Sequence, residues 1–160
     1  MKKYFRLSAI ILPLTLVIYL LLFNNYSVFY FLEKQFEDHV SNAETTLTDN
    51  DALHPKYAYF NNEKIIALRY KDGWECGRIY KRIYLNNDKI KKIIIRNYND
   101  GGDKSCELYD TIYIIEPDIE KIKLYVNFKP AKSIINKKLI ETEITEAAKY
   151  IREVNGWKIH

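Results

Sequence analysis

The chain has few of the residues on which metal and nucleophile chemistry usually depend. Its 160 residues include only two cysteines and three histidines. A structural zinc site needs four converging Cys or His ligands, and a cysteine nucleophile needs a base, usually histidine, to form its thiolate. His39, His54 and His160 form no recognisable motif with Cys76 or Cys106. The sequence therefore predicts no metal site, no cofactor and no catalytic cysteine.

Glycine is scarce as well, and two of the five glycines fall in the stretch "NDGGDK" at residues 99–104. A calcium loop places oxygen ligands at alternating positions, with a glutamate at the twelfth. Counted from Asn97, the fifth position is Gly101 and the twelfth is Leu108. The pattern fails, and the stretch is predicted to be a polar hairpin loop.

A large excess of one charge is also missing. The net charge is +4, but removing Lys2, Lys3 and Arg6 from the 25 basic residues leaves 22 against 21 acidic ones. Nucleic-acid binding through phosphates requires a clear basic excess. We therefore expect no nucleic-acid partner.

The chain does contain an uncharged apolar run at residues 7–23, preceded by three basic residues. The run is close to the length that spans a bilayer, and basic flanks tend to stay in the cytoplasm. This predicts a signal-anchor over residues 1–24 that contacts the membrane through residues 7–23. The protein would then be a single-pass inner (cytoplasmic) membrane protein with its C-terminal domain on the periplasmic, extracytoplasmic side. The alternative is a cleaved signal peptide, although the nearest small-residue triplet after Phe23, Ser41-Asn42-Ala43, comes about twenty residues too late for a cleavage site.

Residues 25–55 differ in character from the remainder of the chain. They begin with aromatic residues, turn polar, and carry one basic residue against six acidic ones. This composition predicts a juxtamembrane segment and then an acidic tether that ends near Pro55.

Residues 56–160 are predicted to form an extracytoplasmic α+β domain. Alternation in residues 79–85 and 122–128, with turn-forming residues every ten to fifteen positions, predicts an antiparallel meander of five or six strands with one solvent-exposed face. Near the end of the chain the period changes, because apolar residues from Ile140 to Val154 recur every three or four positions. They predict a C-terminal helix, with Thr142 as its N-cap, that covers the apolar face of the sheet.

The two cysteines, Cys76 and Cys106, are predicted to form a disulfide. In a plain meander their strands would flank a third, about 9.6 Å apart, whereas a disulfide needs Cα atoms within about 7 Å. The bridge therefore requires at least one cysteine to lie in a loop at the end of a strand. The alternative is two free buried thiols.

Aromatic residues mixed with arginine give a candidate binding surface. The alternation predicts that four tyrosines and one arginine lie together on the solvent-exposed face of the sheet. A surface that combines tyrosine with arginine is typical of protein interfaces. The candidate partner-binding residues are Tyr80, Arg82, Tyr84, Tyr109 and Tyr113. Cross-strand packing on a half-exposed sheet is the alternative interpretation.

These features favour a membrane-anchored protein-binding module of the cell envelope, such as an immunity-type inhibitor or an accessory subunit, with an envelope protein as its partner. One alternative is a structural or assembly component that acts through its transmembrane helix. A third interpretation is an envelope enzyme that uses a carboxylate pair. The acids available for it are Glu75, Asp103, Glu107 and Asp110, and their spacing specifies no reaction.

Overall fold

The computed structural model describes residues 13–19, 25–87, 89–99, 101, 105–127 and 132–159. The helices in this part of the chain are α2 (Asn25–Val40) and α3 (Lys137–Glu153), with a helical turn at residues 13–19 and short 3-10 turns at Pro117–Ile119 and Val154–Gly156. The strands are β1 (Thr45–Thr48), β2 (Lys56–Asn61), β3 (Lys64–Trp74), β4 (Gly77–Asn86), β5 (Lys89–Asn99), β6 (Tyr109–Glu116), β7 (Lys121–Val126), β8 (Lys132–Ile134) and β9 (Lys158–Ile159).

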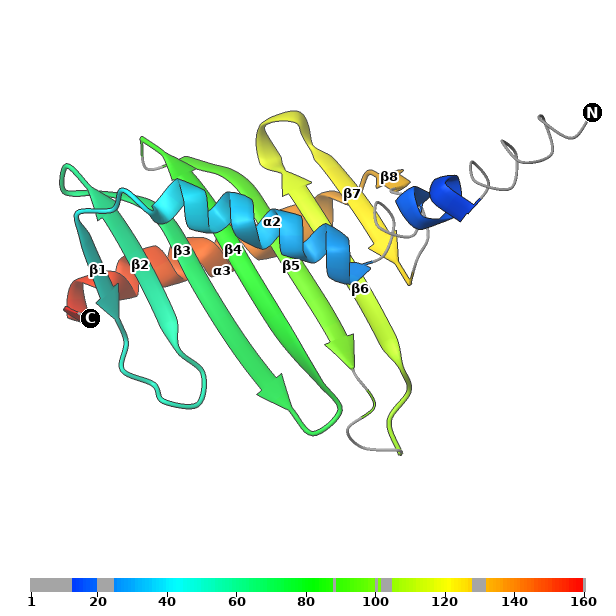
Figure 1. Ribbon diagram of the computed structural model, residues 1–160. Coiled ribbons are helices and arrows are strands. Elements are labelled where there is room, and N and C mark those ends of the chain that lie inside the picture. The colour runs from blue at the N-terminus through cyan, green and yellow to red at the C-terminus, as the bar shows by residue number, and fades with distance from the viewer. Residues whose placement is uncertain are drawn as a thin grey trace, which may run out of the picture.

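All nine of these strands belong to one antiparallel sheet in the order β8-β7-β6-β5-β4-β3-β2-β1-β9. The strands from β1 to β8 form a meander, and the chain returns through α3 so that β9 pairs with β1. Helix α2 crosses one face of the sheet and α3 crosses the other (Figure 1). The described molecule therefore has three layers, helix, sheet and helix.

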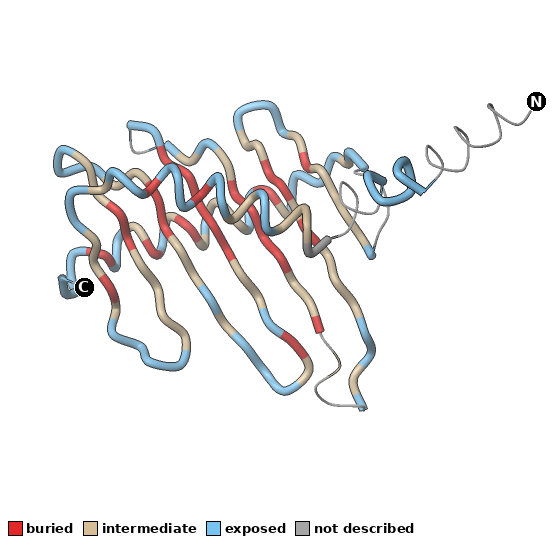
Figure 2. Tube along the Cα trace, in the orientation of Figure 1, coloured by how far each residue is buried: buried red, intermediate tan, exposed pale blue. Residues whose placement is uncertain are grey.

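The two faces of the sheet have separate cores. Alternation along each central strand sends neighbouring residues to opposite faces. On the α3 face, Ile83 and Ile93 pack with Ile140 and Ala147 of the helix. On the α2 face, Ile94 packs with the fully buried Phe36 of α2 and its neighbours. The buried stretches accordingly run through the middle of the central strands, between the helices (Figure 2).

The expected C-terminal helix is present and covers the sheet as predicted, with Ile140, Ala147 and Val154 buried against it. Its start differs from the prediction. The helix begins at Lys137 because Asn136 is the N-cap, whose side chain accepts a hydrogen bond from the Leu139 N–H at 3.0 Å.

Two features of the predicted sheet are wrong. It has nine strands in the described residues rather than five or six, because β1, β8 and β9 contain only four, three and two residues, too few to show alternation in sequence. Nor does it have one solvent-exposed face. Residues 25–55, expected to be a juxtamembrane segment and tether, contribute α2 and β1, and α2 covers the second face.

The predicted membrane helix at residues 7–23 lies mostly outside the described residues, and only residues 13–19 of it are described. Seven helical residues rise about 10 Å, against about 30 Å for a hydrocarbon core. No helix in the described ranges is long and apolar enough to cross a bilayer. The prediction of a single-pass inner-membrane protein with a periplasmic domain is therefore corrected, because the described structure provides no membrane-spanning helix for it.

Candidate functional site

The five residues predicted to bind a partner do not share one surface. Residues directly opposite each other in an antiparallel sheet lie on the same face. Tyr80, Arg82 and Tyr84 of β4 lie on the α2 face, where Arg82 pairs with Ile94 of the α2 core. Tyr113 pairs with Ile95 and packs in the α3 core, and Tyr109 lies on that same face at the end of β6. The sequence analysis predicted that all five lie on one face of the sheet, whereas the structure divides them between its two faces.

Helix α2 covers the three residues of β4. The Arg82 guanidinium holds the Glu33 carboxylate with Nε–Oε2 at 2.9 Å and Nη2–Oε1 at 2.7 Å, and Arg82 is only 5 % exposed. The ring of Tyr84 lies edge-on to Phe36 at 5.4 Å, and the ring of Tyr80 lies 5.7 Å from Phe29. This arginine and these tyrosines therefore fix α2 on the sheet and are not available as a free binding face.

A second polar cluster fixes α3. Lys81 is buried, and its Nζ lies 2.8 Å from a Glu143 oxygen and 2.5 Å from a Glu146 oxygen. The Tyr150 hydroxyl donates to the other Glu146 oxygen at 2.6 Å. Burial raises the pKa of Glu146, but the hydrogen bonds from Lys81 and Tyr150 outweigh it and lower the pKa overall. Because two carboxylates of α3 share one buried lysine of the sheet, the cluster holds the helix on the sheet.

The acids considered for an enzymatic role differ in their surroundings. Asp110 accepts two hydrogen bonds from the Arg96 guanidinium, at 3.1 and 2.8 Å. Glu75 and Glu107 are exposed, and Asp103 lies outside the described residues. Across the described ranges, no group of three or more His, Cys, Asp or Glu side chains is placed to hold a metal ion.

The predicted disulfide between Cys76 and Cys106 is present, with the Cα atoms 5.4 Å apart. Cys76 lies in the two-residue turn between β3 and β4, and Cys106 lies in the connection between β5 and β6. These loops are at the same end of the sheet, the lower end in Figure 1. The disulfide therefore joins two loops beyond the end of β5 and does not have to span the width of that strand. A bridge across 30 residues stabilises a fold by about 3–4 kcal/mol on the chain-entropy estimate.

Large apolar side chains are exposed around this bridge. Trp74 is 48 % exposed, Leu108 65 % and Leu53 81 %. Trp74 lies close to Gly77, and the Tyr109 hydroxyl also lies against this glycine. A Cβ at position 77 would meet both side chains, so glycine is what allows the tryptophan and the tyrosine to approach each other here. We call this end of the sheet, with its disulfide, the disulfide end.

A pocket of about 370 Å³ opens at the disulfide end beside β3. It is bounded by the β1–β2 loop on one side and by the β3–β4 hairpin on the other. Its lining residues are Leu53, His54, Lys71, Asp72, Gly73, Trp74, Gly77 and Arg78.

The carboxylate that lines this pocket already has partners. Asp72 accepts a hydrogen bond from the Tyr70 hydroxyl at 2.6 Å and from the Gly73 N–H at 2.7 Å, and His54 Nε2 lies 3.1 Å from it. The Tyr70 hydrogen bond, with help from Gly73 and His54, lowers the pKa of Asp72. Lys71 and Arg78 form no ion pair with any described residue, so the pocket presents these two cations together with the Asp72 carboxylate.

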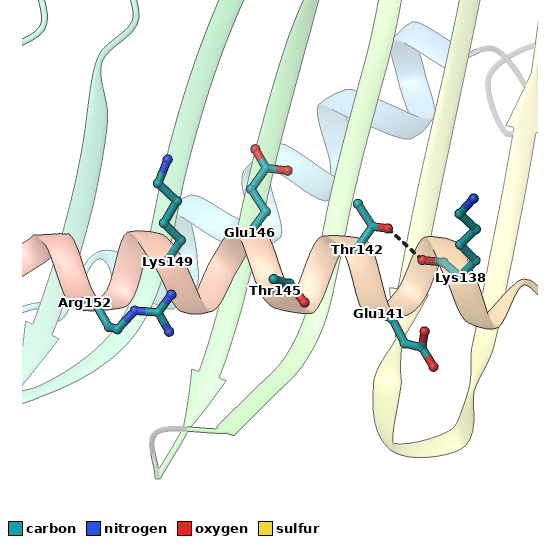
Figure 3. Close-up of a pocket in the computed structure, with 7 residues that line it drawn as sticks. All are labelled: Lys138, Glu141, Thr142, Thr145, Glu146, Lys149 and Arg152. Carbon is teal, nitrogen blue, oxygen red and sulfur yellow. Dashed lines mark hydrogen bonds between the residues drawn. The ribbon is translucent and has the colours of Figure 1, made fainter.

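A larger hollow of about 600 Å³ lies along α3, but it is a weaker candidate. All seven lining residues come from this one helix (Figure 3). The Thr142 hydroxyl donates to the Lys138 carbonyl at 2.8 Å, and Glu146 is held by Lys81. The charged side chains along this face are of both signs, which is usual for a solvated helix face.

Sequence reasoning identified Tyr109, Cys76 and Cys106 but missed Trp74 and Arg78. β3 continues through Lys71-Asp72-Gly73, whose residue types favour a turn, as far as Trp74, and the chain turns at Glu75-Cys76. Glu75-Cys76 is not one of the dipeptides that indicate a two-residue hairpin turn, so no local signal in the sequence indicates this hairpin.

Comparisons with known proteins add no functional information. No protein-family model matches the chain, and neither does any curated protein or any solved structure.

Proposed function

We propose that the chain is a protein-binding module, of the kind that a small inhibitor or an accessory subunit provides, and that it binds its partner through the disulfide end. The observation that carries the proposal is the pocket beside β3, which the exposed Trp74 lines together with two cations, Lys71 and Arg78, that form no ion pair with a described acid. Tryptophan and arginine are among the residue types that contribute most to binding energy at protein interfaces.

The rigidity of this end supports the same proposal. The disulfide ties the loop after Trp74 to the loop before Tyr109, and the pairing of β3 with β4 continues to Trp74 and Gly77. Binding residues that are already ordered lose little conformational entropy when a partner docks. The alternative of assembly through the apolar residues 7–23 is not carried forward, because no described helix could span a bilayer.

A photo-crosslinking residue placed at Trp74 in the full chain, expressed in the cells that produce it, tests this function. We expect a single crosslinked adduct of discrete mass. The protein found in that adduct, once purified, should bind the unmodified chain at a defined stoichiometry in calorimetry. The matched control carries the same crosslinker at Ile119, which is 63 % exposed beside β7, far along the sheet. Equal adducts from both positions, or none from position 74, would contradict the proposal.

A further inference from the structure

The strand that borders the pocket is open on one side. β3 pairs with β4 as far as Trp74 and Gly77, but its pairing with β2 ends at Tyr70 and Lys56. One further hydrogen bond joins the Lys71 N–H to the Pro55 carbonyl at 3.4 Å. Asp72 to Trp74 therefore have a neighbouring strand on the β4 side and, in the described structure, none on the other.

The open edge can pair with another chain. Backbone groups of alternate residues point to the same side of a strand. Because the Lys71 N–H points toward β2, the backbone groups of Gly73 point toward the pocket. The Gly73 N–H is held by the Asp72 side chain at 2.7 Å, which leaves its carbonyl as the acceptor for an incoming N–H. Such open edges are where extended peptides add to sheets.

The two faces of this edge have different chemistry. Gly73 pairs with Arg78, and Lys71 pairs with Tyr80, so both cations lie on the α2 face. Trp74 lies on the opposite face with Asp72, whose carboxylate already accepts a hydrogen bond from the Tyr70 hydroxyl and lies 3.1 Å from His54 Nε2. An added strand would place successive side chains on alternate faces, one against the cations and the next against the indole of Trp74.

From this arrangement we infer that the pocket recognises an extended segment of the partner protein in which an acidic residue alternates with an aromatic or large apolar residue. The acidic side chain lies between Lys71 and Arg78, in the space that Gly73 leaves by having no side chain. The neighbouring side chain packs on Trp74, and Leu53 of the β1–β2 loop also lines the pocket. This inference rests on the proposed function and specifies the partner element that the site takes.

Labelled synthetic peptides test the inference by fluorescence polarisation against the full chain. The probe is an eight-residue peptide of alternating aspartate and tyrosine, and the matched probe replaces each aspartate with lysine. We expect the acidic peptide to bind at least about tenfold more tightly than the lysine peptide, a difference of about 1.4 kcal/mol. N-methylation of alternate backbone amides in the acidic peptide is expected to reduce its affinity to that of the lysine peptide, since strand pairing needs those N–H groups.

Variants of the chain test whether the acidic peptide binds at the open edge of β3. Arg78→Glu and Lys71→Glu are expected to weaken the acidic peptide at least about tenfold each, whereas Lys64→Glu, an exposed lysine at the opposite end of the same strand, is expected to change it less than about twofold. Near-ultraviolet circular dichroism of each variant checks that the fold is retained. Equal binding of both peptides, no effect of N-methylation, or equal losses in all three variants would each overturn the inference.

The outcomes separate this inference from the proposed function. An adduct at position 74 together with peptides that do not discriminate would leave a protein-binding module that recognises its partner by another mode. Self-association through this edge, seen as a dimer in sedimentation that Arg78→Glu abolishes, would overturn the inference in favour of a second copy as the occupant. Failure of both the crosslink and the peptides would remove both proposals.

Discussion

Arg82 is a charged residue in the interior of the molecule, and its environment determines how much its ion pair contributes. Arg82 is 5 % exposed, its guanidinium makes a two-point contact with Glu33, and Nη1 donates to the Lys81 carbonyl at 3.0 Å. Lys91 and Asp118 form a pair of similar length, 2.7 Å, but their side chains are 42 % and 56 % exposed. Breaking a buried pair leaves a charge without solvent or partner, whereas exposed pairs contribute little.

Arg82→Met should therefore destabilise the protein far more than Lys91→Met. We expect a loss of about 3 kcal/mol for Arg82→Met, the low end for a buried pair, because the Glu33 side chain is 26 % exposed and Arg69 Nη2 lies 3.7 Å from the same Glu33 oxygen. For Lys91→Met we expect less than about 1 kcal/mol. Urea denaturation monitored by circular dichroism measures both. Equal losses in the two variants would show that burial is not what distinguishes the pairs.

At the scale of single elements, α3 is attached to the sheet by its apolar stripe and by the contact of Glu143 and Glu146 with Lys81. The lowered pKa of Glu146 couples this contact to pH. Because the pKa is lower in the folded state than in the unfolded chain, the stabilising contribution is complete above the ordinary value of 4.5. It is lost as the pH falls through the folded-state pKa.

Glu146→Gln is accordingly expected to lower the free energy of unfolding at pH 7, and the difference from wild type should shrink toward zero below about pH 4. The measurement is urea denaturation at a series of pH values. Glu141→Gln, on the exposed side of the same helix, serves as the control and should change stability by less than about 0.5 kcal/mol at any pH. If the difference in unfolding free energy between wild type and Glu146→Gln stayed constant from pH 7 to pH 3, the ionisation of Glu146 would not be coupled to stability.

For the whole molecule, the part that could be predicted from sequence was the part with a repeating pattern. The alternation in β4 and the three- and four-residue stripe of α3 are long enough to predict both elements. α2 was predicted to be a juxtamembrane segment because its aromatic residues come after an apolar run, and its docking depends on Glu33 and Phe36 finding partners far away in sequence. The same non-local contact explains why Arg82 and Tyr84 looked like a binding surface when they are interior residues.

The three layers also predict how the molecule unfolds. Each central strand contributes neighbouring residues to both cores, for example Ile83 and Tyr84 of β4. Neither core can be lost without disrupting the strands that form the other, so the described layers should unfold as one cooperative unit. Trp157, which packs against the α3 core, and the far-ultraviolet signal of all strands should then report the same transition.

Phe36→Leu and Ile140→Val test this cooperativity from opposite faces of the sheet. Each substitution should cost about 1 kcal/mol, since each removes little volume from a buried site. Because the two side chains lie in different cores and share no partners, the double variant should lose the sum of the two costs to within about 0.5 kcal/mol. Both single variants should shift the fluorescence and circular dichroism midpoints equally. If Phe36→Leu instead shifted only the circular dichroism transition and left tryptophan fluorescence unchanged, α2 would be a separately melting layer and the sheet would not couple the two cores.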